Sequence, residues 1–423
     1  MKIIHVTNVE KFVADILPKQ PQKNKTIVES ILKDVQKNGD SAIKKYEKKF
    51  NGAKISSLRL SQTEIKDAFS KVSKNQIEAI QLSKSRLIKT ESIVKSILKN
   101  KAIDIDGIKI SKKFTAIQSV GCYIPGGLAR YPSSVIMSVI PAKIAGVKRI
   151  VVVSPPNSNG KIDPLTVVAA NLCGADEIYK MGGAQAIAAL SFGTKSISKV
   201  DKIVGPGGAF VTIAKSLINE RTAIDMLAGP TELGIIADIT ANPRYIALDL
   251  ISQSEHSNDT FCYLITNSEK LAKLVNKFVH DLSDKIKRNN IVKTSLKENG
   301  FIAICKSNSD ITKLANELAP EHLQIMTKNP SIFASKITSS GLILLGDNTP
   351  SSASDYLLGS NHILPTNGFG KIRGSLSVLD YIKINTQVST SKPVLSKILK
   401  HMQIFTEAEG LPNHYEAVRG RID

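Results

Sequence analysis

The chain has 423 residues, of which 42% are hydrophobic, so it can bury a sizeable core and favours two or three structural units over one. Its formal net charge of +20 raises the possibility of a nucleic-acid partner. The lysines, however, are scattered among acids in the first hundred residues, with no aromatic platform on which bases could stack. The composition therefore favours a globular protein with lysine-rich helix surfaces and no nucleic-acid partner.

No segment has the pattern of a signal peptide or a membrane span. The N-terminus reaches charges at Glu10 and Lys11 without a long apolar stretch, and the most apolar region, residues 133–154, is broken by a proline and by charged residues. The four cysteines are widely separated and form no C-x-x-C pair; Cys262 and Cys305 lie in strand-like runs, where a buried thiol is the favoured reading. We expect a soluble, cytoplasmic protein with no membrane partner and no disulfides.

The opening third is predicted to be helical. Residues from about 22 to 100 are rich in lysine and glutamate, and apolar residues such as Ile27, Ile31 and Val35 recur at helical spacing. From Ile117 the pattern changes to short β-branched runs that alternate with glycine turns and alanine-rich helical stretches. This alternation is typical of a parallel, doubly wound sheet.

The region from Lys148 to Lys215 contains the clearest elements. Residues 148–155 predict a buried strand, Asp163-Pro164 begins a helix that runs to about Cys173, and Gly174 ends it. The elements expected next are strands at 177–181 and 200–204 and helices at 184–190 and 209–215. Beyond Ile235 the sequence predicts a helix from Pro243 to about His256, strands at 261–266 and near Phe301 and Leu342, and an intervening helix to about Lys287.

The predicted fold class is therefore α/β, with two doubly wound, incomplete Rossmann-like parallel-sheet domains and helical N- and C-terminal segments. The expected boundaries are an N-terminal helical segment at 1–21, a first domain formed by 22–122 and 232–379, a second domain at 123–231, and a C-terminal segment at 380–423.

Two short segments combine acids, amides and imidazoles. Asn242-Pro243 caps a helix on which Gln253 and His256 fall on one face, at a spacing that allows both to bind one metal ion; a histidine near a helix end is also a common capping group. Glu321 and His322 are adjacent after a proline, and these two residue types suit general acid-base chemistry. A polar surface turn is the alternative for this pair.

Further candidates lie in the last seventy residues. Asp355 and His362 occupy loops of small residues, and Glu409 and His414 lie close to the C-terminus, where disorder is the ordinary expectation. Four of the seven histidines (His256, His322, His362, His414) lie in polar segments that also hold acids or amides. These side chains are the ligands that a zinc site without thiolates requires.

Three glycine turns end predicted strands: Gly126-Gly127, Gly182-Gly183 and the run 205–208. None matches the G-x-G-x-x-G fingerprint. Glycine allows close backbone approach, so the turns indicate either a nucleotide or substrate cleft at the carboxyl ends of the strands or tight strand-helix connections.

The order of these motifs resembles that of the histidinol dehydrogenase family over nearly the whole chain. The matching segments are Gly121-Cys-Tyr-Ile-Pro-Gly-Gly127, Gly182-Gly-Ala-Gln-Ala-Ile-Ala-Ala-Leu190, Ile224-Asp-Met-Leu-Ala-Gly-Pro-Thr-Glu232, Gln253-Ser-Glu-His256, Pro320-Glu-His-Leu323, Asp355-Tyr356 and Asn361-His-Ile-Leu-Pro365. The run from Ile224 to Glu232 is highly specific.

The resemblance implies a zinc- and NAD-dependent homodimer that oxidises L-histidinol through its aldehyde to L-histidine. The implied zinc ligands are Gln253, His256 and Asp355, with His414 from the partner subunit. Glu321 would activate the water that hydrates the aldehyde, and His322 would take the proton of the alcohol. The implied substrate contacts include Thr231, His362 and Glu409 together with the zinc ligands and Glu321, and the implied NAD contacts are Tyr123, Gln185 and Gly208.

Two positions depart from the family pattern: asparagine is common where this chain has Gly208, and Thr231 is a frequent alternative to serine that keeps the hydroxyl. We therefore expect activity with weaker NAD binding. Two rival hypotheses remain open from the residues alone. The first is a zinc hydrolase that uses Glu321 as its base without nicotinamide. The second is a nucleic-acid-binding module built on the lysine-rich helices, whose binding would fall steeply with salt.

Overall fold

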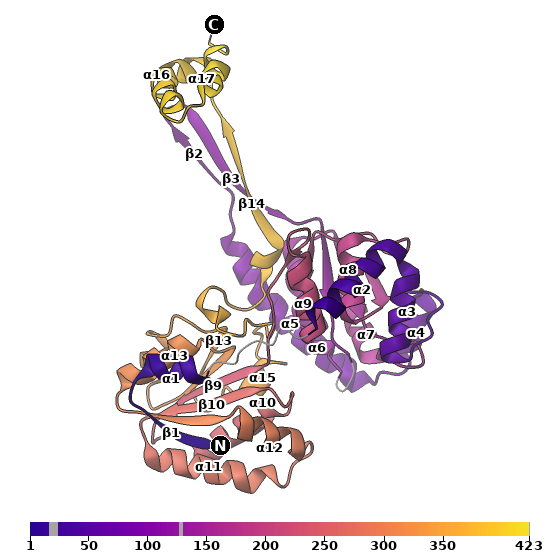
Figure 1. Ribbon diagram of the computed structural model, residues 1–423, viewed down its shortest axis with the longest axis vertical. Coiled ribbons are helices and arrows are strands. Elements are labelled where there is room, and N and C mark those ends of the chain that lie inside the picture. The colour runs from indigo at the N-terminus through magenta and orange to yellow at the C-terminus, as the bar shows by residue number, and fades with distance from the viewer. Residues whose placement is uncertain (17–23, 127–129, 423) are drawn as a thin grey trace.

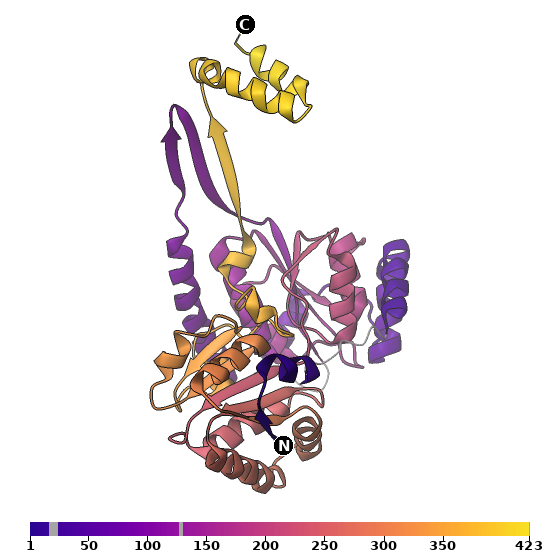
Figure 2. The ribbon, with the colours of Figure 1, turned by 60° about the vertical axis from the view of Figure 1, so that its left-hand side comes forward.

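The computed structural model describes residues 1–16, 24–126 and 130–422. They form two α/β units, each built on a parallel sheet, and an arm that projects from them with the C-terminal helices at its far end (Figure 1). Turning the molecule shows the arm standing clear of both units (Figure 2). The predicted class of two doubly wound parallel sheets is confirmed. Within the described part of the chain, no helix is long and apolar enough to cross a membrane.

The first unit contains a six-stranded sheet in the order β1-β11-β10-β9-β12-β13, and all its pairs are parallel. Its strands are β1 (Lys2–Val6), β9 (Glu232–Ala237), β10 (Phe261–Thr266), β11 (Phe301–Cys305), β12 (His322–Met326) and β13 (Leu342–Leu345). Alternate side chains enter two cores, one beneath α10 (Pro243–Ser254), α11 (Glu269–Ser283) and α12 (Asn289–Glu298), the other beneath α1 (Val9–Ile16), α13 (Asn308–Leu318) and α14 (Pro330–Ala334). Helices therefore cover both faces.

The second unit contains a five-stranded parallel sheet in the order β6-β5-β4-β7-β8. Its strands are β4 (Ser119–Tyr123), β5 (Arg149–Ser154), β6 (Glu177–Lys180), β7 (Lys202–Val204) and β8 (Ala223–Ile224). The chain winds outward from β4 in one direction and resumes on its other side at β7. The topological switch point of this sheet, where open α/β sheets bind ligands, therefore lies between β4 and β7.

Helices α2 to α5 from the N-terminal third, together with four later helices, cover this second sheet. One face carries α2 (Lys25–Asn38), α3 (Asp40–Asn51), α8 (Gly183–Phe192) and α9 (Ala209–Ile218); the other carries α4 (Gln62–Phe69), α5 (Lys74–Ile97), α6 (Pro132–Ala145) and α7 (Pro164–Cys173). Residues 24–97 thus pack mainly on the second sheet, and residues 119–122 form part of its strand β4, whereas the sequence grouped them with residues 232–379. Helix α5 also contacts that later segment, at Tyr356 and Val378. An amphipathic pattern identifies the buried face of a helix but not the sheet on which it packs.

Capping residues fix both ends of α7 and the start of α10 at the positions predicted from the sequence. The Asp163 side chain accepts the Leu165 amide N–H at 3.0 Å at the start of α7, and Gly174 ends that helix with a left-handed φ of 84°. Asn242 caps α10 in the same way, accepting from the Arg244 amide at 3.0 Å. All four cysteines are buried free thiols, as predicted for Cys262 and Cys305.

The two ends of the chain contain strands where helices were expected. Residues 2–6 form β1, which pairs with β11, before α1 begins; residues 17–21 of that expected segment lie outside the described part of the chain. After Asp380 the chain forms β14 (Ile382–Ser389), which joins β2 (Lys101–Ile105) and β3 (Ile108–Ala116) in an antiparallel sheet, the arm sheet. The alternation of Ile382, Ile384, Thr386 and Val388 with polar residues has the period of a strand. Between this strand and residue 422, the helices are α16 (Lys392–Ala408) and α17 (Pro412–Arg419).

Candidate active site between the two units

The adjacent pair Glu321 and His322 is buried at the amino end of β12. Helix α13 ends at Leu318, Ala319 takes a left-handed φ of 45°, and the chain then enters the sheet instead of forming the surface turn that was the alternative. Glu321 is 7% exposed and His322 2% exposed. The predicted acid-base pair therefore has little access to water, and this burial can shift the pKa values of both side chains.

A second carboxylate, Glu232, lies directly beside this pair at the amino end of β9. The Glu321 carboxylate accepts the Glu232 amide N–H at 2.8 Å, and the Glu232 carboxylate accepts the Glu321 amide at 3.1 Å and the Asn367 amide at 2.8 Å. Burial raises the pKa of Glu321 to about 7 and that of Glu232 to about 8. Glu232 was not among the residues expected at the site, although it is a carboxylate that opens an otherwise apolar strand.

His322 is held through both ring nitrogens. Its Nδ1 lies 3.3 Å from the carbonyl oxygen of Glu232, and its Nε2 lies 3.2 Å from Oδ1 of Asp355. Burial alone would lower the pKa of His322, but the Glu321 and Asp355 carboxylates outweigh it and raise the pKa to about 9. In the conformation described here, the imidazole favours its protonated form at neutral pH.

Asp355 and His362 lie in the loops between β13 and β14, which also contain α15 (Ser351–Ser354), η1 (Phe369–Lys371) and η2 (Val378–Tyr381). The His362 Nδ1 contacts the carbonyl oxygen of Asp355 at 2.7 Å, and its Nε2 lies 3.3 Å from Oγ of Ser134 on α6. The second unit also supports this loop from α5, where the Ser83 hydroxyl donates to the Tyr356 carbonyl at 2.6 Å. Both units therefore position the residues of the site.

Of the four residues considered as zinc ligands, three lie in this region. Gln253 is buried in the last turn of α10, and His256 follows just beyond the end of that helix at Ser254, two residues earlier than predicted. His256 and Asp355 are close enough to interact electrostatically. Across residues 1–16, 24–126 and 130–422, no group of three His, Cys, Asp or Glu side chains is arranged to hold a metal ion.

The fourth ligand, His414, and the expected substrate contact Glu409 are exposed at the far end of the arm (Figures 1 and 2). Glu409 follows α16, and His414 lies in α17. The structure of a single chain does not bring either residue to Glu321 or Asp355.

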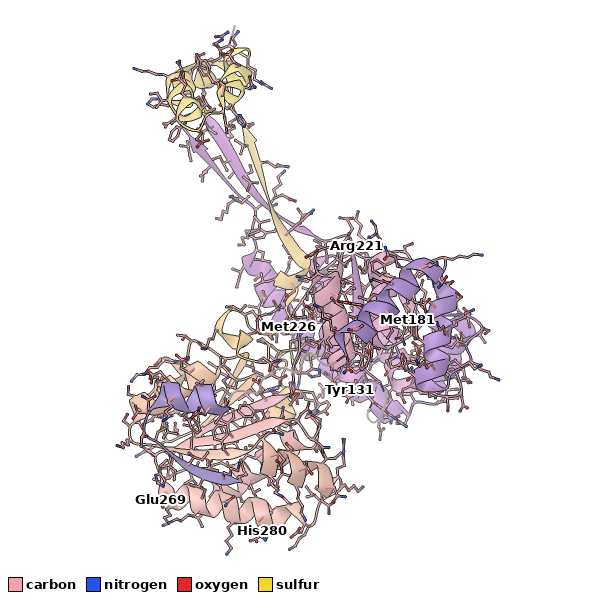
Figure 3. The ribbon with its side chains drawn as sticks, viewed as in Figure 1. Tyr131, Met181, Arg221, Met226, Glu269 and His280 are labelled. Carbon is pink, nitrogen blue, oxygen red and sulfur yellow. The ribbon has the colours of Figure 1, made fainter. Side chains whose placement is uncertain are left out.

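A cavity of about 60 Å³ joins the two units. It is lined from both sides, by residues that include Gly205, Pro206, Thr231, Glu321, His362 and Thr366. Met226, another lining residue, is labelled in Figure 3 where the two units meet. The carboxyl end of β7 thus faces the amino ends of β9 and β12, which places the switch point of the second sheet opposite the acid-base pair.

The residues expected to bind NAD lie at the carboxyl edge of the second sheet. Tyr123 ends β4, and its hydroxyl oxygen accepts the Gly183 amide N–H at 3.1 Å. Gln185, in the first turn of α8, is 1% exposed, and its Oε1 has no hydrogen-bond partner. At Gly205, where φ is 111°, a Cβ would lie 2.1 Å from the Tyr123 carbonyl oxygen, so only glycine fits. At Gly208, which caps α9, a Cβ would have no heavy atom within 4 Å; Gly127 lies outside the described residues.

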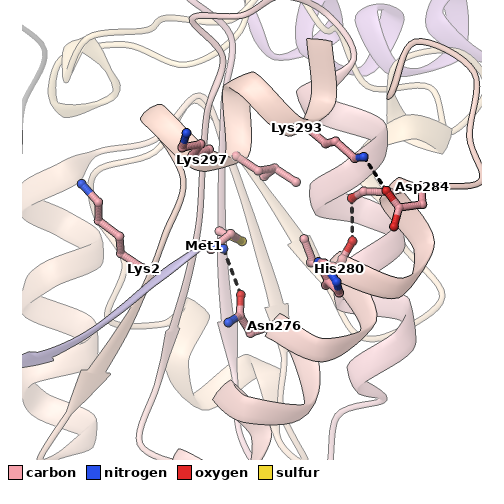
Figure 4. Close-up of a pocket in the computed structure, with 10 residues that line it drawn as sticks. Met1, Lys2, Asn276, His280, Asp284, Lys293 and Lys297 are labelled. Carbon is pink, nitrogen blue, oxygen red and sulfur yellow. Dashed lines mark hydrogen bonds and ion pairs between the residues drawn. The ribbon is translucent and has the colours of Figure 1, made fainter. Parts of the chain in front are cut away.

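A larger cavity of about 590 Å³ lies elsewhere, among β1, α11 and α12 (Figure 4). Lys2, Lys293 and Lys297 are exposed at its walls, and Lys293 is already paired with Asp284. None of the expected site residues lines this cavity. Cavity volume therefore does not indicate the candidate site in this protein. The cluster of buried titratable side chains around the smaller cavity does.

Glycine turns at a switch point, opposite a buried acid-base pair, are the arrangement expected of an α/β enzyme that binds its ligands between two units. The histidinol dehydrogenase family profile matches residues 18–422. The chain is 42% identical over 397 residues to histidinol dehydrogenase from Methanocaldococcus jannaschii, covering 94% of this chain and 92% of that protein. It is 42% identical to the enzyme from Bacillus cereus over 97% of this chain and 94% of that protein.

A crystal structure of histidinol dehydrogenase from Elizabethkingia anophelis superimposes with a TM-score of 0.94 at 35% identity, covering 100% of this chain and 98% of that chain. The chain therefore belongs to the histidinol dehydrogenase family of oxidoreductases.

Proposed function

We propose that this protein catalyses the NAD-dependent, four-electron oxidation of L-histidinol through L-histidinaldehyde to L-histidine, the last steps of histidine biosynthesis. The observation that carries the proposal is the buried Glu321–His322 pair, of which Glu321 lines the cavity between the two units and His322 lies directly behind it in the chain. Two successive oxidations at one carbon require a group that exchanges the alcohol proton and a second group that activates water for the aldehyde stage. The names of the relatives supply the substrate.

His322 is the candidate for the alcohol proton. Its Nδ1 is directed at the Glu232 carbonyl, so Nε2 is the nitrogen left to exchange a proton. Asp355 contacts Nε2 in the described conformation, and withdrawal of this carboxylate toward another ligand would leave Nε2 available as a base. Glu321, whose pKa is about 7 because of its burial, is suited to remove a proton from the hydrating water near neutral pH.

Gln253, His256 and Asp355 are the residues that would hold zinc within one chain. Their amide, imidazole and carboxylate donors match the nitrogen and oxygen ligands that Zn²⁺ takes, and His256 and Asp355 already lie near each other. Bound zinc would anchor the imidazole and amine of the substrate. The set is incomplete without a further protein ligand, and His414 of a second copy would supply it.

The nicotinamide cofactor would accept the two electron pairs of the reaction. Tyr123, Gln185 and Gly208 would hold it at the edge where β4 and β7 end. Gly205 has no side chain to keep a ligand away from the backbone at this edge. The Oε1 atom of Gln185, which has no hydrogen-bond partner in the protein, is available to accept a hydrogen bond from that ligand. Thr231, His362 and Glu409 would contact the substrate on the other side of the cavity.

We also propose a homodimer in which the arm reaches the active site of the partner. The arm exposes large apolar side chains on several of its elements: Ile103, Ile384 and Phe405 are 57%, 59% and 67% exposed. Such a surface, standing clear of its own chain, favours burial against another protein surface. A second copy is the occupant that would also deliver Glu409 and His414 to an otherwise incomplete site.

A single assay tests the proposed function. Purified protein is mixed with zinc, NAD and L-histidinol, and the absorbance of reduced nicotinamide is followed to completion. Two NADH per histidinol are expected. A folded, zinc-loaded dimer that produces no NADH would refute the proposal, and hydrolysis of amide or peptide substrates without NAD would favour the zinc-hydrolase alternative.

A further inference from the structure

Glu47 is a completely buried carboxylate in the lysine-rich N-terminal third of the chain. It lies on α3, and its carboxylate accepts three hydrogen bonds. Oε1 accepts from the Gly182 amide at 2.7 Å and from Gln185 Nε2 at 2.9 Å, and Oε2 accepts from Asn51 Nδ2 at 2.6 Å. A buried carboxylate with this many donors is a fixed part of the structure, because its removal would leave those donors unpaired.

The carboxylate sets the orientation of the Gln185 amide. An ionised carboxylate can only accept hydrogen bonds, so the amide must direct Nε2 toward Glu47. Its Oε1 is therefore fixed on the other side, where it is buried and has no partner. A group that bound Gln185 there would have to donate a hydrogen bond.

Glu47 also occupies the position that a phosphate takes in many nucleotide sites. Gly182 and Gly183 lie at the amino end of α8, where free amides and the helix dipole favour an anion. Here the Gly182 amide is bound by Glu47 and the Gly183 amide by the Tyr123 hydroxyl. A phosphate at this turn would find both donors occupied and would be repelled by the carboxylate.

We propose that Glu47 is a positioning residue for the dinucleotide: it fixes Gln185 as a hydrogen-bond acceptor and reserves the Gly182–Gly183 turn for an uncharged, hydroxyl- or amide-bearing part of the cofactor, not for its phosphates. This inference rests on the proposed use of NAD. Glu47 has no contact with the acid-base pair, so its effect is on cofactor binding and not on the chemical step.

The test compares E47Q with E91Q. Glu91 is a matched control, because it is also a buried helical glutamate (3% exposed) that accepts a backbone amide, from Val378 at 2.7 Å, but it lies on α5, on the opposite face of the sheet. In E47Q the Gly182 amide N–H still requires an acceptor, so the new carbonyl oxygen stays at the Oε1 position and the new amide group faces Asn51. Gln185 is then held by an uncharged and therefore weaker acceptor, and the turn loses the charge that repels phosphate. We expect the KM for NAD to rise about tenfold, with kcat at saturating NAD changed less than about threefold. E91Q should leave the KM for NAD as in the parent protein.

Calorimetric titration with NAD alone supplies a readout independent of turnover. The Kd should rise for E47Q and not for E91Q. An unchanged Kd in a folded E47Q protein would overturn the inference, as would an equal rise in E91Q. If the parent protein itself bound no NAD, the proposed function would fail instead, so the two failures are distinguishable.

A double-mutant cycle tests whether Glu47 acts through Gln185. In a Gln185→Ala background, E47Q should raise the KM for NAD much less than in the parent, because the oriented amide is already absent. Full additivity would contradict the positioning role. If E47Q does not fold, Asn51→Ala removes only one donor from the Glu47 carboxylate and should give a smaller rise in Kd for NAD; an unchanged Kd there would also overturn the inference.

Discussion

Glu232 and Glu321 bind each other's backbone: each carboxylate accepts the amide N–H of the other residue, at 2.8 and 3.1 Å. The exchange links the amino ends of two neighbouring strands, β9 and β12. It fixes the Glu321 side chain and, through the Glu232 carbonyl, the His322 ring. The geometry of the predicted acid-base pair therefore depends on a third residue that does not line the cavity.

We predict that Glu232→Ala destabilises the protein by about 2–4 kcal/mol, because it leaves the buried amide of Glu321 and the half-buried amide of Asn367 without acceptors and opens a void. The same change should lower kcat more than about tenfold, because the Glu321 carboxylate loses its alignment. Urea unfolding and steady-state kinetics measure the two effects. A variant with lower stability but unchanged kcat would show that Glu321 is aligned without Glu232.

Stability should depend on pH through Glu232. Burial raises its pKa from 4.5 to about 8, so between these values the folded protein holds a proton that the unfolded chain releases. The free energy of unfolding therefore falls as the pH rises through this window. Glu232→Gln should flatten the fall by up to about 1.4 kcal/mol per pH unit. Unfolding midpoints from pH 5 to 8 test this, and parallel curves for the two proteins would contradict it.

Two glycines at the same turn should respond oppositely to substitution. Gly205→Ala places a methyl group 2.1 Å from the Tyr123 carbonyl at a φ of 111°, and we expect it to destabilise the protein by about 2 kcal/mol or more and to weaken NAD binding. Gly208→Asn enters open space at a φ of −68° and supplies a favourable helix cap. It should maintain stability and tighten NAD binding, as measured by thermal unfolding and NAD titration. Weaker binding in Gly208→Asn would contradict a cofactor role for this position.

Intersubunit complementation tests the proposed shared site. Coexpression of Glu321→Ala and His414→Ala chains should produce mixed dimers in which one site has both residues intact. With random pairing, about a quarter of the parent activity should return, whereas each variant alone is inactive. An inactive mixture, with mixed dimers verified by two affinity tags, would show that the two residues do not serve one site across subunits.

The local elements could be predicted from the sequence because their signals are local. Asp163 and Gly174 mark the ends of α7 within a short window, and the adjacency of Glu321 and His322 guarantees that they share a location. The role of Glu232 could not be predicted, because its partners lie 89 and 135 residues away. For the same reason, the pattern of α2 and α3 did not reveal that they pack on the second sheet. The strand β14 was missed although its apolar residues alternate, because the segment is short and mostly polar and is followed by a long stretch with helical spacing.

The arm sheet joins segments that are far apart in the sequence, since Phe114 of β3 pairs with Ile384 of β14. During synthesis, β3 leaves the ribosome long before β14 and has one edge unpaired until nearly the whole chain has emerged. An unpaired edge with exposed isoleucines is a template for aggregation. A chain truncated before Ile382 therefore loses more than its last two helices: it retains an open strand edge that should favour degradation or association of incomplete chains.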